Sequence, residues 1–137
     1  MKAKGLTRET IRDLGVLDRG FPDFEIGDAI EVSQWIVEGT KKRTQIFEGD
    51  VIAMHKNGVS STFTVRKIAA NGVAVERIYP FYTPAIEKIE ILRKGDVRRA
   101  KLYYMRGRVG RKARVKEKVV SREAKQHMRE KKQEEKA

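Results

Sequence analysis

Apolar residues alternate with polar ones along the middle of the chain at the spacing that is typical of half-buried β-strands. Turn-forming residues interrupt the alternation at Gly39, Asn57-Gly58 and Asn71-Gly72, and the last pair is a strong signal for a two-residue hairpin turn. Within the second apolar run, Gly49 breaks the alternation and indicates a β-bulge. The pattern predicts five strands, at 28–37, 44–54, 59–68, 73–79 and 86–92.

These five strands predict a mostly β fold. Short strands and tight turns within roughly 65 residues favour a small antiparallel barrel over an open sheet, because closure removes the edges that invite aggregation. An SH3-like barrel is the architecture we expect. An OB-type barrel is the alternative, because the number of strands does not distinguish the two.

Helical spacing occurs on both sides of the strands. Residues 6–14 predict a short N-terminal helix with Thr7 as its cap. The chain is accordingly divided into an N-terminal helix and linker at 1–20, the barrel at 21–94, and a basic C-terminal helix and extension at 95–137.

The C-terminal helix is predicted to begin after Gly95, with Asp96 as its cap. An apolar stripe would pack on the barrel while several cations point away; it consists of Val97, Ala100 and Tyr104. Because this region is poor in core-forming residues, we expect it to become ordered on binding a partner.

The charge of the chain is concentrated at its C-terminal end. The net charge is +12, and the 45 residues from Arg93 onward carry 18 of the 31 Lys and Arg residues but 6 of the 19 Asp and Glu residues. The first 92 residues are therefore neutral. Clustered like charges destabilise a free protein, so this distribution indicates a polyanionic partner, and nucleic acid has the densest regular array of phosphates.

The densest part of the basic region is 93–116, with eleven cations and the single acid Asp96. Seven of the eleven are Arg, whose planar fork matches phosphate oxygens. The cations are Arg93, Lys94, Arg98, Arg99, Lys101, Arg106, Arg108, Arg111, Lys112, Arg114 and Lys116. Tyr103 and Tyr104 lie among them, and at most one of two adjacent residues can face the barrel, so the other is available for stacking or hydrogen bonding.

Two smaller basic clusters lie within the predicted strands and turns. One is the first hairpin turn, with Lys41, Lys42 and Arg43, and the other is Arg66 and Lys67 on the central strand. No heptads or residues set to read bases stand out, so contact with phosphates and recognition of shape favour folded RNA over a DNA operator.

Composition excludes several other classes of protein. The chain has no cysteine, hence no disulfide, thiolate nucleophile or cysteine-ligated zinc. No apolar run approaches the length of a membrane span, and residues 1–15 lack the apolar core of a secretory signal. We therefore expect no cofactor, no metal, no membrane partner and no small-molecule substrate.

The sequence gives little support to catalysis. His55 and His127 lie in a predicted turn and in the charged tail, where a solvated surface histidine is the common interpretation. Glu48 and Asp50 share a strand face, as solvent-facing positions of a half-buried sheet do. The tetrapeptide 107–110 has the GXXG form of a KH domain, but it follows a barrel rather than lying between the helices of an α/β fold. We expect no catalytic residue.

Four blocks of sequence resemble the bacterial large-subunit (50S) ribosomal protein nineteen family. They are QIFEG at 45–49, FTVRKI at 63–68, VERIYP at 75–80 and VRRAKLYY at 97–104, and together with their surroundings they span about 24–116. The tail after Lys118 exceeds the usual family length.

The resemblance implies a structural constituent of the large ribosomal subunit, in the cytoplasm, with an SH3-like barrel and a basic C-terminal helix and extension that bind large-subunit ribosomal RNA. It further implies a position at the interface with the small subunit, an intersubunit bridge to small-subunit ribosomal RNA, and the ribosomal protein numbered fourteen as a neighbour. The RNA contact carries over to Arg98, Arg99, Lys101 and Arg106, and to Arg66, Lys67 and Arg77 in the strand blocks. The alternatives are an RNA-processing enzyme and a nucleoid or translation-factor module of SH3-like type.

Overall fold

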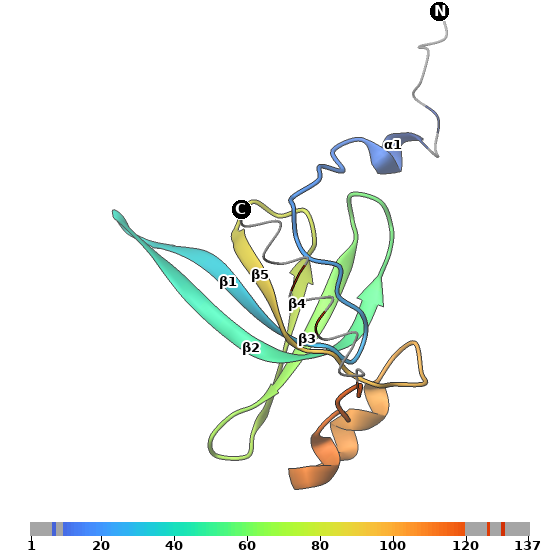
Figure 1. Cartoon of the computed structure of the whole chain (residues 1–137). Helices are drawn as coiled ribbons and strands as arrows, with labels where there is room; N and C mark the ends of the chain where they lie inside the picture. The colour runs from blue at the N-terminus through green and yellow to red at the C-terminus, as the bar shows by residue number, and fades with distance from the viewer. Residues whose placement is uncertain (1–6, 8–9, 120–125, 127–129, 131–137) are drawn as a thin grey trace, which may run out of the picture.

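Five antiparallel strands form a single sheet in the order β4-β3-β2-β1-β5 (Figure 1). The structure is a computed structural model that describes residues 7, 10–119, 126 and 130. The strands are β1 (Ala29–Glu38), β2 (Lys41–His55), β3 (Thr62–Ile68), β4 (Ala74–Pro80) and β5 (Ile86–Arg93). The mostly β class and the five strands predicted from the sequence are confirmed.

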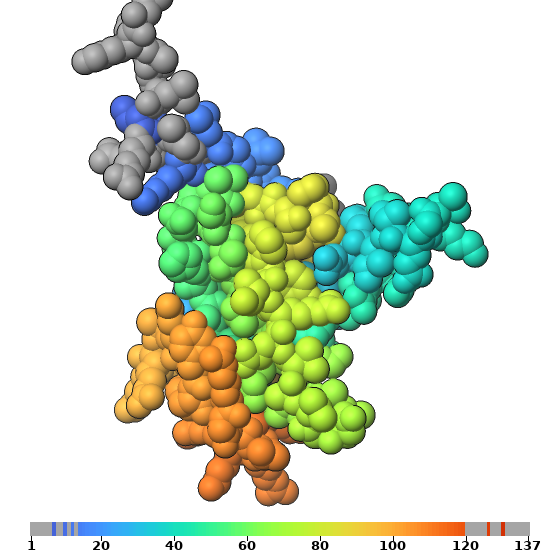
Figure 2. Space-filling view, turned by 180° about the vertical axis from the view of Figure 1, so that it is seen from behind, coloured from blue at the N-terminus to red at the C-terminus, as the bar shows by residue number. Residues whose placement is uncertain are grey.

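Strand β2 begins three residues before its predicted start. The β1–β2 ladder continues without interruption to the pair Glu38↔Lys41, which leaves Gly39 and Thr40 for the turn. Gly39 has a φ of 61°, a backbone conformation that glycine adopts without strain. The result is a long hairpin whose tip projects away from the rest of the sheet (Figures 1 and 2).

The bulge predicted at Gly49 is wrong. Strands β1 and β2 pair regularly through Ile30↔Gly49, and the irregularity of β2 lies between Val51 and Ala53, where β2 pairs with β3. Glycine is needed at 49 for another reason: a Cβ atom there would lie 2.5 Å from the carbonyl oxygen of Arg66. The absent side chain allows a close approach of neighbouring backbone.

The sheet bends around one core, although the closed SH3-like barrel is not confirmed. Strands β4 and β5 are the two ends of the strand order, and no pairing between them occurs in the described part of the chain. Their side chains nevertheless share one apolar cluster, because Tyr79 of β4 and Ile86 of β5 are buried with Phe63 of β3.

The N-terminal helix is present. Its described part is helix α1 (Thr10–Asp13), and the predicted start at Leu6 lies outside the described residues. Thr7 caps it as predicted, because its hydroxyl accepts the backbone N–H of Thr10 at 3.2 Å. The backbone N–H of Val59 also donates to the carbonyl oxygen of Arg12 (2.8 Å), which ties the helix to the loop before β3.

The predicted C-terminal helix after Gly95 is wrong over residues 96–119. Only two short 3-10 helices occur in this range, η1 (Tyr103–Gly107) and η2 (Gly110–Ala113). Backbone groups of this segment bond to distant partners instead of to the next turn: Leu102 N–H donates to the Ile52 carbonyl oxygen, and Asp96 N–H to that of Lys116, both at 2.8 Å. These bonds are incompatible with a continuous α-helix.

A second, smaller apolar cluster lies beneath these 3-10 helices. Leu102 and Met105 are 0% and 2% exposed, and they pack with Ile52, Ala53 and Val115. Val97 is partly buried against this cluster, as predicted, but Ala100 and Tyr104 of the predicted stripe are exposed.

Among the described helices, none is long and apolar enough to cross a membrane.

Candidate nucleic-acid interface

The densest basic segment, Arg93–Lys116, is called the basic arm below. It leaves the end of β5, passes through η1 and η2 beside the sheet, and returns to its own starting point (Figures 1 and 2). Two backbone hydrogen bonds close this loop: Asp96 N–H to the Lys116 oxygen and Lys118 N–H to the Lys94 oxygen, at 2.8 and 2.9 Å. The arm up to this point is folded against the sheet, contrary to the expectation that binding would be needed to order it.

The way in which the arm docks determines which of its side chains face outward. Leu102 and Met105 point into the second apolar cluster, and the hydrogen bond from Leu102 to Ile52 fixes the arm to β2. The charged neighbours Lys101 and Arg106 consequently remain exposed. Burial of a few apolar residues thus forces a dense row of cations to the surface.

Most of the cations of the arm are not neutralised by the protein. Arg93 pairs with Asp50, Lys94 with Asp28, and Arg106 with Glu76. The other eight form no ion pair with any acid in the described part of the chain, and all eight are exposed: Arg98, Arg99, Lys101, Arg108, Arg111, Lys112, Arg114 and Lys116.

Both tyrosines of the arm are exposed, at 45% for Tyr103 and 37% for Tyr104, so neither belongs to the seam with the sheet. Each ring is instead covered by guanidinium groups. Arg106 lies 4.6 Å from the centroid of Tyr103, while Arg99 and Arg108 lie 5.2 and 4.6 Å from that of Tyr104. Such cation–π contacts restrict each guanidinium group to the neighbourhood of a ring.

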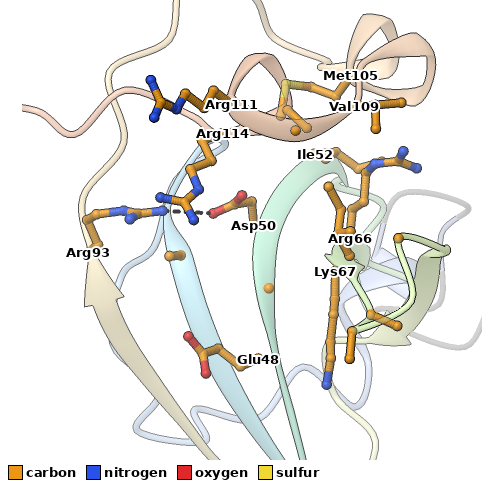
Figure 3. Close-up of a pocket in the computed structure, with 18 residues that line it drawn as sticks. Glu48, Asp50, Ile52, Arg66, Lys67, Arg93, Met105, Val109, Arg111 and Arg114 are labelled. Carbon is orange, nitrogen blue, oxygen red and sulfur yellow. Dashed lines mark ion pairs between the residues drawn. The ribbon is translucent and has the colours of Figure 1, made fainter.

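A groove of about 1070 Å³ separates the arm from the middle of β2 and the end of β3 (Figure 3). Its polar lining is mixed but mostly basic, with Glu48 and Asp50 among cations from the sheet and from the arm. Figure 3 shows two arginines directed toward Asp50, Arg93 from the end of β5 and Arg114 from the arm segment above. The cations that line it are Arg66, Lys67, Arg93, Arg111 and Arg114.

Burial raises the pKa of one of the two acids in this groove, Asp50. The Asp50 side chain is 20% exposed, and loss of hydration raises the pKa of its carboxyl group, while Arg93 opposes the shift through a 3.6 Å contact. Glu48, two residues earlier on β2, is exposed. Both acids were predicted to face solvent, and Asp50 is only partly exposed.

In the described residues, no group of three or more histidine, aspartate or glutamate side chains is placed to hold a metal ion.

A second acid, Glu76, joins the sheet to the arm. Its Oε1 accepts Nη1 of Arg66 (2.8 Å), and both its oxygens accept the forked guanidinium of Arg106, with Nη2 at 2.9 Å from Oε2. The bonds from Arg106, with help from Arg66, lower the pKa of the Glu76 carboxyl group. This three-residue cluster fixes the orientation of Arg106.

The remaining predicted RNA-binding cations lie outside the arm, and among them Lys67 also lines the groove. Lys41, Lys42 and Arg43 are exposed at the projecting β1–β2 hairpin, where Arg43 pairs with Glu38 and Lys42 lies 4.2 Å from the ring of Trp35. Arg77 and the ammonium group of Lys67 lie 5.1 and 5.5 Å from the ring of Phe47. The structure therefore presents cations in three places: the arm and its groove, the hairpin tip, and the part of β3 and β4 beside Phe47.

The residues that hold the site together were not identified from the sequence. Asp28 is completely buried and accepts three donors: Nζ of Lys94 (2.8 Å) and the backbone N–H groups of Glu25 (2.9 Å) and Gly95 (3.0 Å). Neither Asp28 nor Glu76 was singled out from the sequence. A signal existed for Glu76, because the hairpin at Asn71-Gly72 places it directly opposite Arg66.

Comparison with known proteins gives one consistent result. The family model described as Ribosomal protein L19 matches residues 8–118. A protein of Clostridium botulinum (strain Loch Maree / Type A3) named large ribosomal subunit protein bL19 is 55% identical over 98 residues, which cover 72% of this chain and 85% of that protein. A protein of the same name from Clostridium botulinum strain Hall is 54% identical over the same shares.

Proposed function

The chain belongs to the ribosomal protein L19 family, a structural and non-enzymatic component of the large ribosomal subunit, and we propose that its basic arm is the part that binds large-subunit ribosomal RNA. The family places the protein in the ribosome of the cytoplasm and assigns it to translation as part of a ribonucleoprotein.

The observation that carries the proposal is the row of eight exposed arm cations without an acidic partner in the described chain. A protein gains no stability from concentrating like charges on one folded loop. RNA phosphates would neutralise them and release counterions, and the guanidinium groups of Arg99 and Arg108, held on the ring of Tyr104, would present their donors at a lower ordering cost.

The finer parts of the proposal concern the other basic surfaces. The groove beside Asp50 would accept one strand of the RNA backbone along Arg111 and Arg114. The projecting hairpin, with Lys41 and Lys42 at its tip, would reach small-subunit ribosomal RNA at the subunit interface and contribute to an intersubunit bridge, with the ribosomal protein numbered fourteen as a neighbour.

Two further parts of the proposal concern architecture. The sheet that bends around one core would be a variant of the SH3-like barrel, with β4 and β5 meeting through side chains. The unit boundaries would be those predicted: an N-terminal segment at 1–20, the sheet at 21–94 and the basic extension at 95–137.

Washing of ribosomes at high salt tests whether the protein is an integral constituent. We expect it to remain with purified large subunits through a wash in about 1 M monovalent salt, because many simultaneous phosphate contacts and folded RNA hold it in place. A translation factor or nucleoid protein of similar shape would be released. Recovery of the chain only in the supernatant would contradict the proposal.

Charge neutralisation tests whether the arm is the binding segment. Replacing Arg98, Arg99 and Lys101 with Gln should weaken binding to protein-free large-subunit RNA and reduce the salt slope by about 2 to 3 units, at about 0.7 to 0.9 per lost phosphate contact. Thermal unfolding should barely change, because all three side chains are exposed.

A matched control removes the same charge from another place. The triple variant Lys131→Gln, Lys132→Gln and Lys136→Gln, in the tail after Lys118, should leave the salt slope within about 1 unit of the unmodified protein. Equal losses in the two triple variants would show that net charge, and not the arm, determines binding. A large fall in melting temperature for the arm variant alone would mean that those side chains serve the fold.

A further inference from the structure

A carboxylate on the edge strand of the sheet organises two arginines that lie far apart in sequence. Arg66 of β3 and Glu76 of β4 are directly opposite in the strand register, and their side chains meet at 2.8 Å. Arg106 of η1 approaches the same carboxylate with three donor–acceptor contacts of 2.9 to 3.2 Å. This is the forked geometry in which arginine binds an anion most strongly.

The exposed fraction of the side chains increases from Arg66 through Glu76 to Arg106. The Arg66 side chain is 9% exposed, Glu76 is 23% exposed and Arg106 is 53% exposed. Arg66 is therefore fixed within the sheet, and Glu76 transmits that fixed position to a cation at the surface. Arg106 also lies on the ring of Tyr103, so two contacts restrict its guanidinium while Nη1 has no bond to Glu76.

We propose that Glu76 is a positioning residue for RNA recognition, which holds Arg106, and with it the turn Tyr103–Gly107, in the orientation that meets an RNA phosphate. This inference rests on the proposed function of the arm. Glu76 itself would not touch RNA. Its effect on binding would pass through Arg106.

The sign of the effect distinguishes positioning from simple electrostatics. Removing an acid from a protein that binds a polyanion raises the net positive charge and on that ground strengthens binding. If Glu76 positions Arg106, its removal weakens binding in spite of the gained charge. A glutamine at 76 has one accepting oxygen in place of two, and its amide N–H₂ group faces a guanidinium that has only donors, so the fork is lost.

The experiment compares Glu76→Gln with Glu87→Gln, using protein-free large-subunit RNA and titrations from 50 to 200 mM salt. Glu87 is an exposed acid of β5, and its carboxylate accepts a bond from the hydroxyl of Thr44 at 3.2 Å, away from the arm. The two substitutions change the charge equally. We expect about a tenfold loss of affinity for Glu76→Gln and unchanged or slightly higher affinity for Glu87→Gln.

Two further variants separate positioning from loss of fold. Glu76→Asp keeps the charge on the same strand and should restore at least half of the lost affinity on a logarithmic scale. Arg106→Lys keeps the charge but cannot form the fork, and adding Glu76→Gln to Arg106→Lys should cause less than a twofold further loss. The Glu76→Asp measurement holds even if Glu76→Gln alone lowers the melting temperature.

The results that overturn the inference differ from those that overturn the proposed function. If the unmodified protein fails to bind the RNA, the assignment of the arm is wrong. If it binds and Glu76→Gln matches Glu87→Gln, or if the losses from Glu76→Gln and Arg106→Lys simply add, Glu76 does not act through Arg106.

Discussion

Two aspartates of the sheet have opposite roles because their surroundings differ. Asp28 is fully buried with three donors around its carboxylate, and burial is compensated by those bonds. Asp50 is partly buried with one distant partner, Arg93 at 3.6 Å, and its pKa is raised because burial outweighs that contact. The first carboxylate supports the junction of sheet and arm, whereas the second costs free energy of folding.

For Asp28→Asn we expect the free energy of unfolding to fall by about 2 to 4 kcal/mol, as measured by urea titration. The amide group cannot accept all three donors, and it leaves the ammonium group of Lys94 without its anion. The control is Asp23→Asn, an exposed residue five positions earlier, which should change stability by less than about 0.5 kcal/mol. Equal stability of the two variants would show that the Asp28 bonds do not hold the junction.

For Asp50→Asn we expect unchanged or slightly higher stability and stronger RNA binding by about two- to threefold, because an acid leaves a basic groove. The pKa of Asp50 is raised in the folded protein, so its ionisation costs stability at neutral pH, and that cost disappears as the pH falls through the raised value. The stability gained by Asp50→Asn should therefore diminish toward acidic pH. Melting curves from pH 3 to 7 measure this, and a loss of stability at pH 7 would show that the pair with Arg93 dominates.

At the scale of elements, the path of the arm depends on one crowded crossing. Gly95 lies against the backbone of Gly27, where a Cβ atom would meet the Gly27 carbonyl oxygen, and Gly27 itself has a φ of 94° with Val97 packed beside it. Two backbone segments pass here without room for a side chain. This contact, with the bond from Gly95 N–H to Asp28, sets the direction in which the arm leaves the sheet.

We expect Gly95→Ala to lower the melting temperature by at least about 5 °C, because the added methyl group forces the crossing apart. Gly107→Ala is the matched control: a Cβ atom there would meet nothing within 4 Å. It should leave the melting temperature within about 2 °C. Equal effects from both variants would mean that the glycine content of the arm, and not the crossing, determines stability.

The strands were predictable because their signals are local. Alternation and the turns at Gly39 and Asn71-Gly72 locate all five to within a few residues. The helix predicted after Gly95 was wrong because helical spacing carries no information about distant partners: the carbonyl oxygen of Ile52, roughly fifty residues away, takes the N–H of Leu102. Closure of a barrel is likewise a property of the whole sheet, and pattern alone does not establish it.

The candidate site was predictable in composition but not in arrangement. The density of cations in the arm is visible in the sequence, and the structure places eight of them at the surface without acidic partners in its described part. The sequence does not show that Lys94 and Arg106 are held by Asp28 and Glu76, because those pairs form across 66 and 30 residues. RNA contact by the individual cations, Arg66 included, stays a prediction.

At the scale of the whole molecule, a neutral sheet carries a cationic loop that it anchors at three points. The crossing at Gly95, the apolar contacts of Leu102 and Met105, and the Glu76 cluster each fix a different part of the arm. The arm is thus folded against the sheet and is not an extended tail. An arm ordered before binding loses less conformational entropy when it meets RNA, which favours tight attachment.

The number of free cations sets the salt dependence of the complete protein. If the eight unpaired cations of the arm each meet a phosphate, the slope of log K against log salt should be about −6 to −7, and affinity should fall by about 10⁴ between 50 and 200 mM salt. Filter binding to protein-free large-subunit RNA measures the slope. A chain ending at Lys118 should retain it, since all eight cations precede that residue. A slope shallower than about −3 would contradict the assignment, because most of the exposed guanidinium and ammonium groups would then face solvent in the complex.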